Sequence, residues 1–151
     1  MKTQKIGLVL LSIWCSLEIA VAAWVTAMTF AGRAPPALLL VMPEARISSV
    51  PHDALAVIKA QAAIANPCIC AVSVMALVLA WRGVARGQRW TWWLLVGTLL
   101  PLQASAFGSD TFLGNRNLVA NLISTLMLTA ALALCGTGRR RAAGGAASEP
   151  R

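Results

Sequence analysis

Residues 81–93 read WRGVARGQRWTWW, a segment that holds four of the six tryptophans of the chain together with three arginines. Long apolar runs flank it, residues 62–81 on one side and residues 90–107 on the other. Tryptophan favours the headgroup layer of a bilayer, and arginine placed between such residues meets water and lipid phosphate. The segment therefore predicts a hairpin at a membrane surface. Its expected interface anchors are Trp81, Arg82, Arg86, Arg89, Trp90, Trp92 and Trp93.

The composition of the whole chain indicates lipid rather than water as its surroundings. The 151 residues are 58% hydrophobic and 12% charged, whereas a soluble domain carries about 25% charged residues. Mean hydropathy is +0.72. Two further apolar runs, residues 6–30 and 118–135, bring the set to four, and each approaches the roughly 20 residues that a helix needs to cross a bilayer. The sequence predicts an all-α fold, a four-helix transmembrane bundle.

The basic residues predict how this bundle is oriented. A net charge of +8 suits nucleic-acid binding, but nine of the thirteen basic residues lie before the first run, between the second and third, or after the fourth. The positive-inside rule assigns these three segments to the cytoplasm. We therefore expect both termini to be cytoplasmic, a location in the bacterial cytoplasmic (inner) membrane, the lipid bilayer as the main partner, and no nucleic-acid partner.

The ends of the chain define the expected domain. The first run is longer than the roughly 7–15 residues of a signal-peptide core, which predicts an uncleaved span. Asp53 is expected to cap the second helix. Gly136 is expected to end the fourth, because glycine interrupts helices. Residues 1–136 then form a single four-span transmembrane domain, and residues 137–151 a disordered basic cytoplasmic tail.

Glu18 is the most conspicuous polar residue within the runs. It lies about 18 Å along its helix from Ile6, near the bilayer centre, where a charge costs about 2.5–3.5 kcal/mol on insertion scales. The carboxyl group must therefore be protonated, paired or solvated. Helical spacing assigns other polar residues to the outer half of the bundle. The candidate ligand-binding cluster consists of Glu18, Lys59, Asn66, Gln103, Asn117 and Asn121.

A purely structural role stays open for this cluster, because polar side chains join membrane helices through hydrogen bonds of about 0.6 kcal/mol on average. A face of small residues in the third run also predicts close helix packing. That face consists of Gly97, Pro101, Ser105 and Gly108. Cys68 and Cys70 point about 200° apart on a regular helix and cannot easily chelate one ion. We expect no metal site and no cofactor, and catalytic residues are not apparent.

Short motifs mark the connections and the second run. They are Met42-Pro43, Gln61, Asn66-Pro67, Asn115 and Asn117. Over residues 41–121 this pattern resembles the anthrone-oxygenase-like family, although the entry to the last run, GNRN, lacks that family's proline. The resemblance implies a small four-helix membrane protein. For some members of the family it implies a cofactor-free oxygenase that acts on polycyclic phenols.

Three functions remain open from the sequence. The chain is expected first to be a non-enzymatic membrane protein that binds a small ligand, a lipid or partner helices through a polar interior. The second hypothesis is a cofactor-free membrane oxygenase or oxidoreductase that acts on a hydrophobic aromatic substrate. The third is a small ion- or proton-coupled transporter subunit, which at this size needs to form a homo-oligomer. Beyond the bilayer, the expected partners are a hydrophobic small molecule or another membrane protein.

Overall fold

The computed structural model describes residues 2–36, 38, 44–112 and 118–145. This part of the chain is helical throughout its regular elements, as predicted. The four long helices are α1 (Lys2–Phe30), α4 (His52–Arg82), α5 (Arg89–Phe112) and α6 (Leu118–Gly145). Two short elements connect them, α3 (Glu44–Ile47) before α4 and the 3-10 helix η1 (Val84–Arg86) between α4 and α5.

The helix ends differ from the predicted ones. α6 continues to Gly145, beyond the predicted end at Gly136, because alanine and arginine sustain a helix after the apolar run has ended. The remaining part of the predicted tail, residues 146–151, lies outside the described residues. The predicted Asp53 cap is wrong. The helix begins at His52, directly after Pro51 and two residues before the start that a cap at Asp53 implies, and no side chain caps it.

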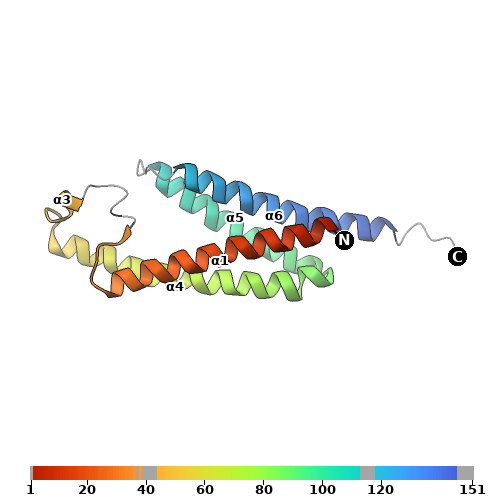
Figure 1. The fold of residues 1–151 in the computed structure, drawn as a ribbon, viewed down its shortest axis with the longest axis horizontal. Coiled ribbons are helices and arrows are strands. Elements are labelled where there is room, and N and C mark those ends of the chain that lie inside the picture. The colour runs from red at the N-terminus through yellow and green to blue at the C-terminus, as the bar shows by residue number, and fades with distance from the viewer. Residues whose placement is uncertain (1, 37, 39–43, 113–117, 146–151) are drawn as a thin grey trace.

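Helix α1 is central to the arrangement. It packs along α4 on one side and along α6 on the other, and α5 lies against α6 (Figure 1). Helices α4 and α6 run in the same direction, and α1 and α5 run in the opposite one. Helices α4 and α5 are consecutive but make far less contact with each other than α1 makes with either neighbour. The start of α1 and the end of α6 lie at the same end of the bundle, where α4 also turns back into α5 (Figure 1).

Large apolar side chains lie both inside and outside the bundle. The interior is centred on Leu11, Leu95, Leu99 and Leu128, which are fully buried. Many outward-facing side chains of the long helices are equally apolar, and on α1 they form one stripe. The exposed stripe on α1 consists of Ile6, Val9, Ile13, Leu17, Val21 and Trp24. A helix that is apolar on all sides suits a lipid environment.

Three helical segments of the described chain are long and apolar enough to cross a membrane: Lys2–Phe30, His52–Arg86 and Leu118–Thr137. Helix α5 is not among these segments, and its sequence contains Gln103, Ser105 and Asp110 between apolar residues. Three of the four predicted spans are therefore confirmed as long and apolar enough to cross a membrane.

A very close contact between α1 and α6 is made by a glycine that the sequence did not single out. A Cβ atom at Gly7 of α1 would lie 2.7 Å from the backbone nitrogen of Cys135 and 2.9 Å from the backbone oxygen of Ala131, both on α6. The predicted close packing of the small-residue face of α5 is wrong. Gly97 and Gly108 are exposed, with no atom within 4 Å of a Cβ at either position. Helix α5 instead buries Thr91, Leu95, Leu99 and Gln103.

Candidate functional site

Three side chains connect α1 to α6 through a directed chain of polar contacts. The buried indole of Trp14 donates a hydrogen bond from Nε1 to the Ser124 hydroxyl, at 2.8 Å. The Ser124 hydroxyl is in turn the hydrogen-bond partner of the half-buried Glu18 carboxyl. An indole N–H can only donate, whereas a hydroxyl accepts and donates. The polarity therefore runs from Trp14 through Ser124 to Glu18.

A second polar contact lies one residue further along α6 and faces α5. Gln103 is 6% exposed, and its Nε2 donates to Thr125 Oγ1 at 3.0 Å. Thr125 donates its own hydroxyl proton to the backbone oxygen of Asn121, at 2.7 Å. Consecutive residues of α6 thus bond to α1 and to α5. We refer to Trp14, Glu18, Gln103, Ser124 and Thr125 as the polar layer.

Of the other predicted cluster residues, Asn121 accepts from Thr125 through its backbone oxygen, whereas the remaining three bond elsewhere or lie outside the described residues. Lys59 Nζ donates to the backbone oxygen of Gly32 at 2.7 Å, just beyond the C-terminal end of α1, where a cation is favourable. Asn66 Nδ2 donates to Ala62 O at 2.7 Å within its own helix. Asn117 lies outside the described residues. Glu18 and Gln103 therefore both lie in the polar layer. Lys59 and Asn66 do not, and each bonds instead to a backbone oxygen.

Sequence reasoning assigned neither Trp14 nor Ser124 to the site. The spacing from Trp14 to Glu18 is one helical turn, which places both on one face of α1. This spacing was the available signal. It was missed because an indole is most often read as an apolar or interfacial group, although its N–H needs a partner when buried.

The cysteines make no arrangement suited to a metal. Cys15 and Cys135 are buried, Cys68 is exposed, and the thiol of Cys70 donates to Ile19 O at 3.5 Å. Within the described part of the chain, no three side chains of His, Cys, Asp or Glu gather closely enough to hold a metal ion. The motif residues behind the family resemblance are largely outside the described residues, because positions 42, 43, 115 and 117 are not described.

The predicted hairpin is a compact turn fixed to α1. Gly87 adopts a left-handed conformation, φ 78°, which lets the chain turn back after η1. Gln4 Nε2 donates to Val84 O at 2.7 Å, so the start of α1 is tied to η1. The three arginines of the hairpin are exposed at this end of the bundle. They are Arg82, Arg86 and Arg89.

The four tryptophans of the hairpin lie in two different environments. Trp90 and Trp93 are exposed, and Trp81 is half exposed, with Nε1 donating to Ser12 Oγ at 2.9 Å. Trp92 is partly buried and donates from Nε1 to Leu132 O at 3.0 Å, so it joins α5 to α6. Trp92, which was predicted to anchor the chain at the membrane interface, thus also makes a contact inside the bundle.

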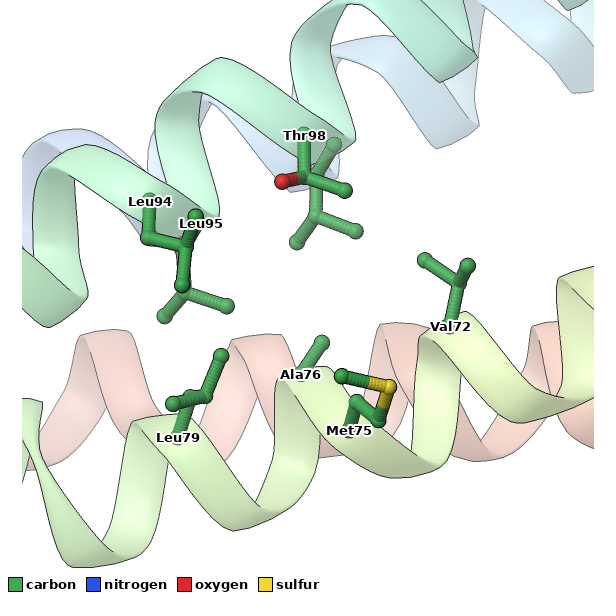
Figure 2. Close-up of a pocket in the computed structure, with 8 residues that line it drawn as sticks. Val72, Met75, Ala76, Leu79, Leu94, Leu95 and Thr98 are labelled. Atoms are coloured by element: carbon green, nitrogen blue, oxygen red, sulfur yellow. The ribbon is translucent and has the colours of Figure 1, made fainter.

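An apolar pocket of about 120 Å³ lies between α4 and α5. Figure 2 shows Leu79, Ala76 and Val72 of α4 opposite Leu94, Leu95 and Thr98 of α5. Ala76, Leu95 and Leu99 are buried and form its floor, whereas Met75 and Leu94 are exposed at its rim. The pocket follows from the weak packing of α4 on α5. No family model, curated protein or solved structure matches the chain.

Proposed function

We propose that the chain is a four-span integral membrane protein that binds a small amphipathic molecule at Glu18, on the α1 side of the polar layer. The direction of the helices supports the fourth crossing. Helices α4 and α6 run the same way, so the segment between them has to return across the membrane if both are spans (Figure 1). Helix α5 has 24 residues, about 36 Å, which exceeds the roughly 30 Å hydrocarbon layer.

The distribution of charge supports cytoplasmic termini for this protein. Gln4 bonds to Val84, so the basic N-terminal segment and the arginine hairpin lie at one end of the bundle. The C-terminal end of α6, whose sequence contains Arg139, Arg140 and Arg141, lies at the same end (Figure 1). The positive-inside rule places that end in the cytoplasm.

The observation that carries the binding function is the relay from Trp14 through Ser124 to Glu18. It orients a hydroxyl proton towards a carboxyl group that stays partly exposed on α1. A carboxylate accepts about four hydrogen bonds, and the Ser124 hydroxyl supplies one of them. A molecule with an apolar body and a hydroxyl or ammonium group matches this combination of a polar acceptor and apolar surroundings.

Substitution of Glu18 tests the binding function. Glu18→Gln keeps the volume and the hydrogen bond to Ser124 but loses the negative charge. A hydrogen bond to a charged group contributes about 1.5–3 kcal/mol, so affinity for a cationic or hydroxylated ligand should fall roughly 10- to 100-fold. Small molecules that remain bound after purification in mild detergent are identified and quantified by mass spectrometry, and thermal unfolding checks the fold.

Gln103→Leu is the matched control, because it removes a polar side chain of the same layer that faces α5 rather than Glu18. The control should retain the ligand. Equal ligand retention by Glu18→Gln, Gln103→Leu and the unmodified protein would show that Glu18 does not bind the molecule. Loss of ligand from both variants would instead assign the effect to general loosening of the layer.

The topology is tested separately with reporters. A reporter fused after Arg151 should be cytoplasmic, and a reporter inserted near Ser48 should be external, because an odd number of crossings separates them. If both report the same side of the membrane, the four-span topology is wrong, whatever the Glu18 variants show.

A further inference from the structure

The pocket between α4 and α5 lies close to the most basic end of the bundle. Its lining residues Leu79 and Leu94 lie within about two helical turns of Arg82 and Arg89, which are both exposed. Figure 2 shows that the apolar side chains of the two helices face one another across this space. The apolar pocket and the exposed arginines thus lie next to each other along α4 and α5.

The sequence around the pocket provides no negative charge to balance the hairpin arginines. Between Asp53 and Asp110 the sequence contains no aspartate or glutamate. The N-terminal segment that bonds to η1 adds Lys2 and Lys5 at the same end. An anionic group bound beside the pocket would therefore meet positive charge from two segments of the chain and no acidic side chain from residues 54–109.

We propose that this pocket and the hairpin arginines together hold one anionic phospholipid. A segment of an acyl chain lies between α4 and α5, and the phosphate of the headgroup contacts Arg82 and Arg89. The site is separate from Glu18 and rests only on the proposal that the chain spans a membrane.

The size of the pocket determines which part of the lipid it holds. Its volume, about 120 Å³, is close to that of an apolar cavity of about 150 Å³ that admits a benzene-sized group. The pocket therefore takes part of one chain rather than a whole lipid tail. Lipid tails are as apolar as leucine, so the pocket alone gives little preference over bulk lipid. The preference for this lipid has to come from the arginines, because guanidinium binds phosphate in a bidentate manner.

Lipid retention tests the headgroup contact. The full chain is purified in mild detergent and titrated with phosphatidylglycerol or with phosphatidylcholine of identical acyl chains, and bound lipid is counted by native mass spectrometry. The unmodified protein should prefer phosphatidylglycerol. Arg82→Gln combined with Arg89→Gln should weaken its binding roughly 30-fold, from the usual contribution of two basic residues near an anionic surface.

A double variant at the opposite end provides the matched control. Arg33→Gln with Arg46→Gln removes the same net charge from two exposed positions far from the pocket, and it should retain the lipid. Equal binding of the two lipids by the unmodified protein would overturn the proposal. So would an equal loss in both double variants, which would reduce the effect to net charge. Glu18→Gln should leave phospholipid retention unchanged, which separates this site from the polar layer.

The acyl-chain contact needs its own test. Thr98→Phe places a ring in the pocket from its rim, whereas Ser105→Phe adds the same bulk to an exposed position of α5 outside it. Only the first should release phosphatidylglycerol. If Thr98→Phe fails to accumulate, the unmodified protein is irradiated with phosphatidylglycerol that carries a diazirine on the acyl chain. Labelled peptides should come from residues 72–79 and 94–99, and labelling spread evenly over the outer faces of α1 and α6 would refute the contact.

Discussion

Gly7→Ala should separate α1 from α6. The added Cβ atom would lie 2.7 Å from the backbone nitrogen of Cys135, about 0.7 Å closer than the 3.4 Å at which ordinary contact begins. Backbone atoms of a helix cannot turn aside as a flexible side chain can, so the two helices have to move apart. A gap of about 0.5–1 Å removes a quarter to a half of the dispersion energy of the contacts that it opens.

The expected loss of stability follows from two opposing effects. Overpacking at a tight contact costs typically about 1–3 kcal/mol, whereas alanine in a helix interior is favoured over glycine by about 1 kcal/mol. Gly97→Ala isolates the second effect, because a Cβ at that position meets nothing within 4 Å. The difference in unfolding free energy between Gly7→Ala and Gly97→Ala should therefore be about 1–3 kcal/mol, with Gly7→Ala the less stable.

The assay is reversible unfolding of both variants in mixed detergent micelles, followed by helical circular dichroism. A second measurement is the indole ¹⁵N–H resonance of Trp14, whose hydrogen bond to Ser124 lies two turns further along the α1–α6 contact. This resonance should shift in Gly7→Ala and stay in place in Gly97→Ala. Equal stability of the two variants, with an unmoved Trp14 resonance, would refute the close approach of α1 to α6 at Gly7.

Three further predictions concern the contacts of α5 and its hairpin. Trp92→Phe should destabilise the protein by about 0.5–1.5 kcal/mol, because the hydrogen bond from the indole N–H to Leu132 O is lost. The same unfolding assay in micelles measures this loss. Thr125→Val should cost about 1–3 kcal/mol of unfolding free energy, because it leaves the buried amide of Gln103 without its partner. Gln103→Leu should cost less than about 1 kcal/mol. A reversed order in the same assay would contradict the hydrogen bond between the two side chains. Replacing the hairpin arginines by glutamate should cause misinsertion or poor accumulation, which protease protection of the two termini detects, and normal topology would contradict the role of these charges. The substituted residues are Arg82, Arg86 and Arg89.

The sequence predicted the helices more reliably than their contacts. Apolar runs of sufficient length located all four long helices, since a helix that meets lipid has to be apolar along its length. The ends were less predictable, because hydrogen bonding within a helix continues after hydropathy falls, as it does in α6 from Gly136 to Gly145.

The sequence could not predict how each helix is oriented about its own axis. In a soluble helix the apolar face identifies the core, but here α1 buries Leu11 and exposes Ile13, and hydropathy does not distinguish the two. The small residues of α5 therefore predicted a contact that lies instead at Gly7 of α1.

The same ambiguity affected the candidate site. Glu18 and Gln103 belong to the polar layer, but Ser124, the hydrogen-bond partner of Glu18, was not in the predicted cluster. Periodicity aligns polar residues along one helix and says nothing about which neighbour they face. Only the packing of α1 on α6 decides that Ser124 turns towards Trp14 and Glu18, while Thr125 turns towards α5.

The separation of Trp14 and Ser124 by 110 positions in the chain affects how the protein is made. At about 5–20 residues per second, a ribosome needs about 5 to 20 s after Trp14 to reach Ser124. In the proposed topology, α1 enters the bilayer first and waits for α6 throughout this interval with its indole and its carboxyl group without their final partner. In that topology, the length and the apolar outer stripe of α1 would hold this first segment in the membrane until the last helix arrives.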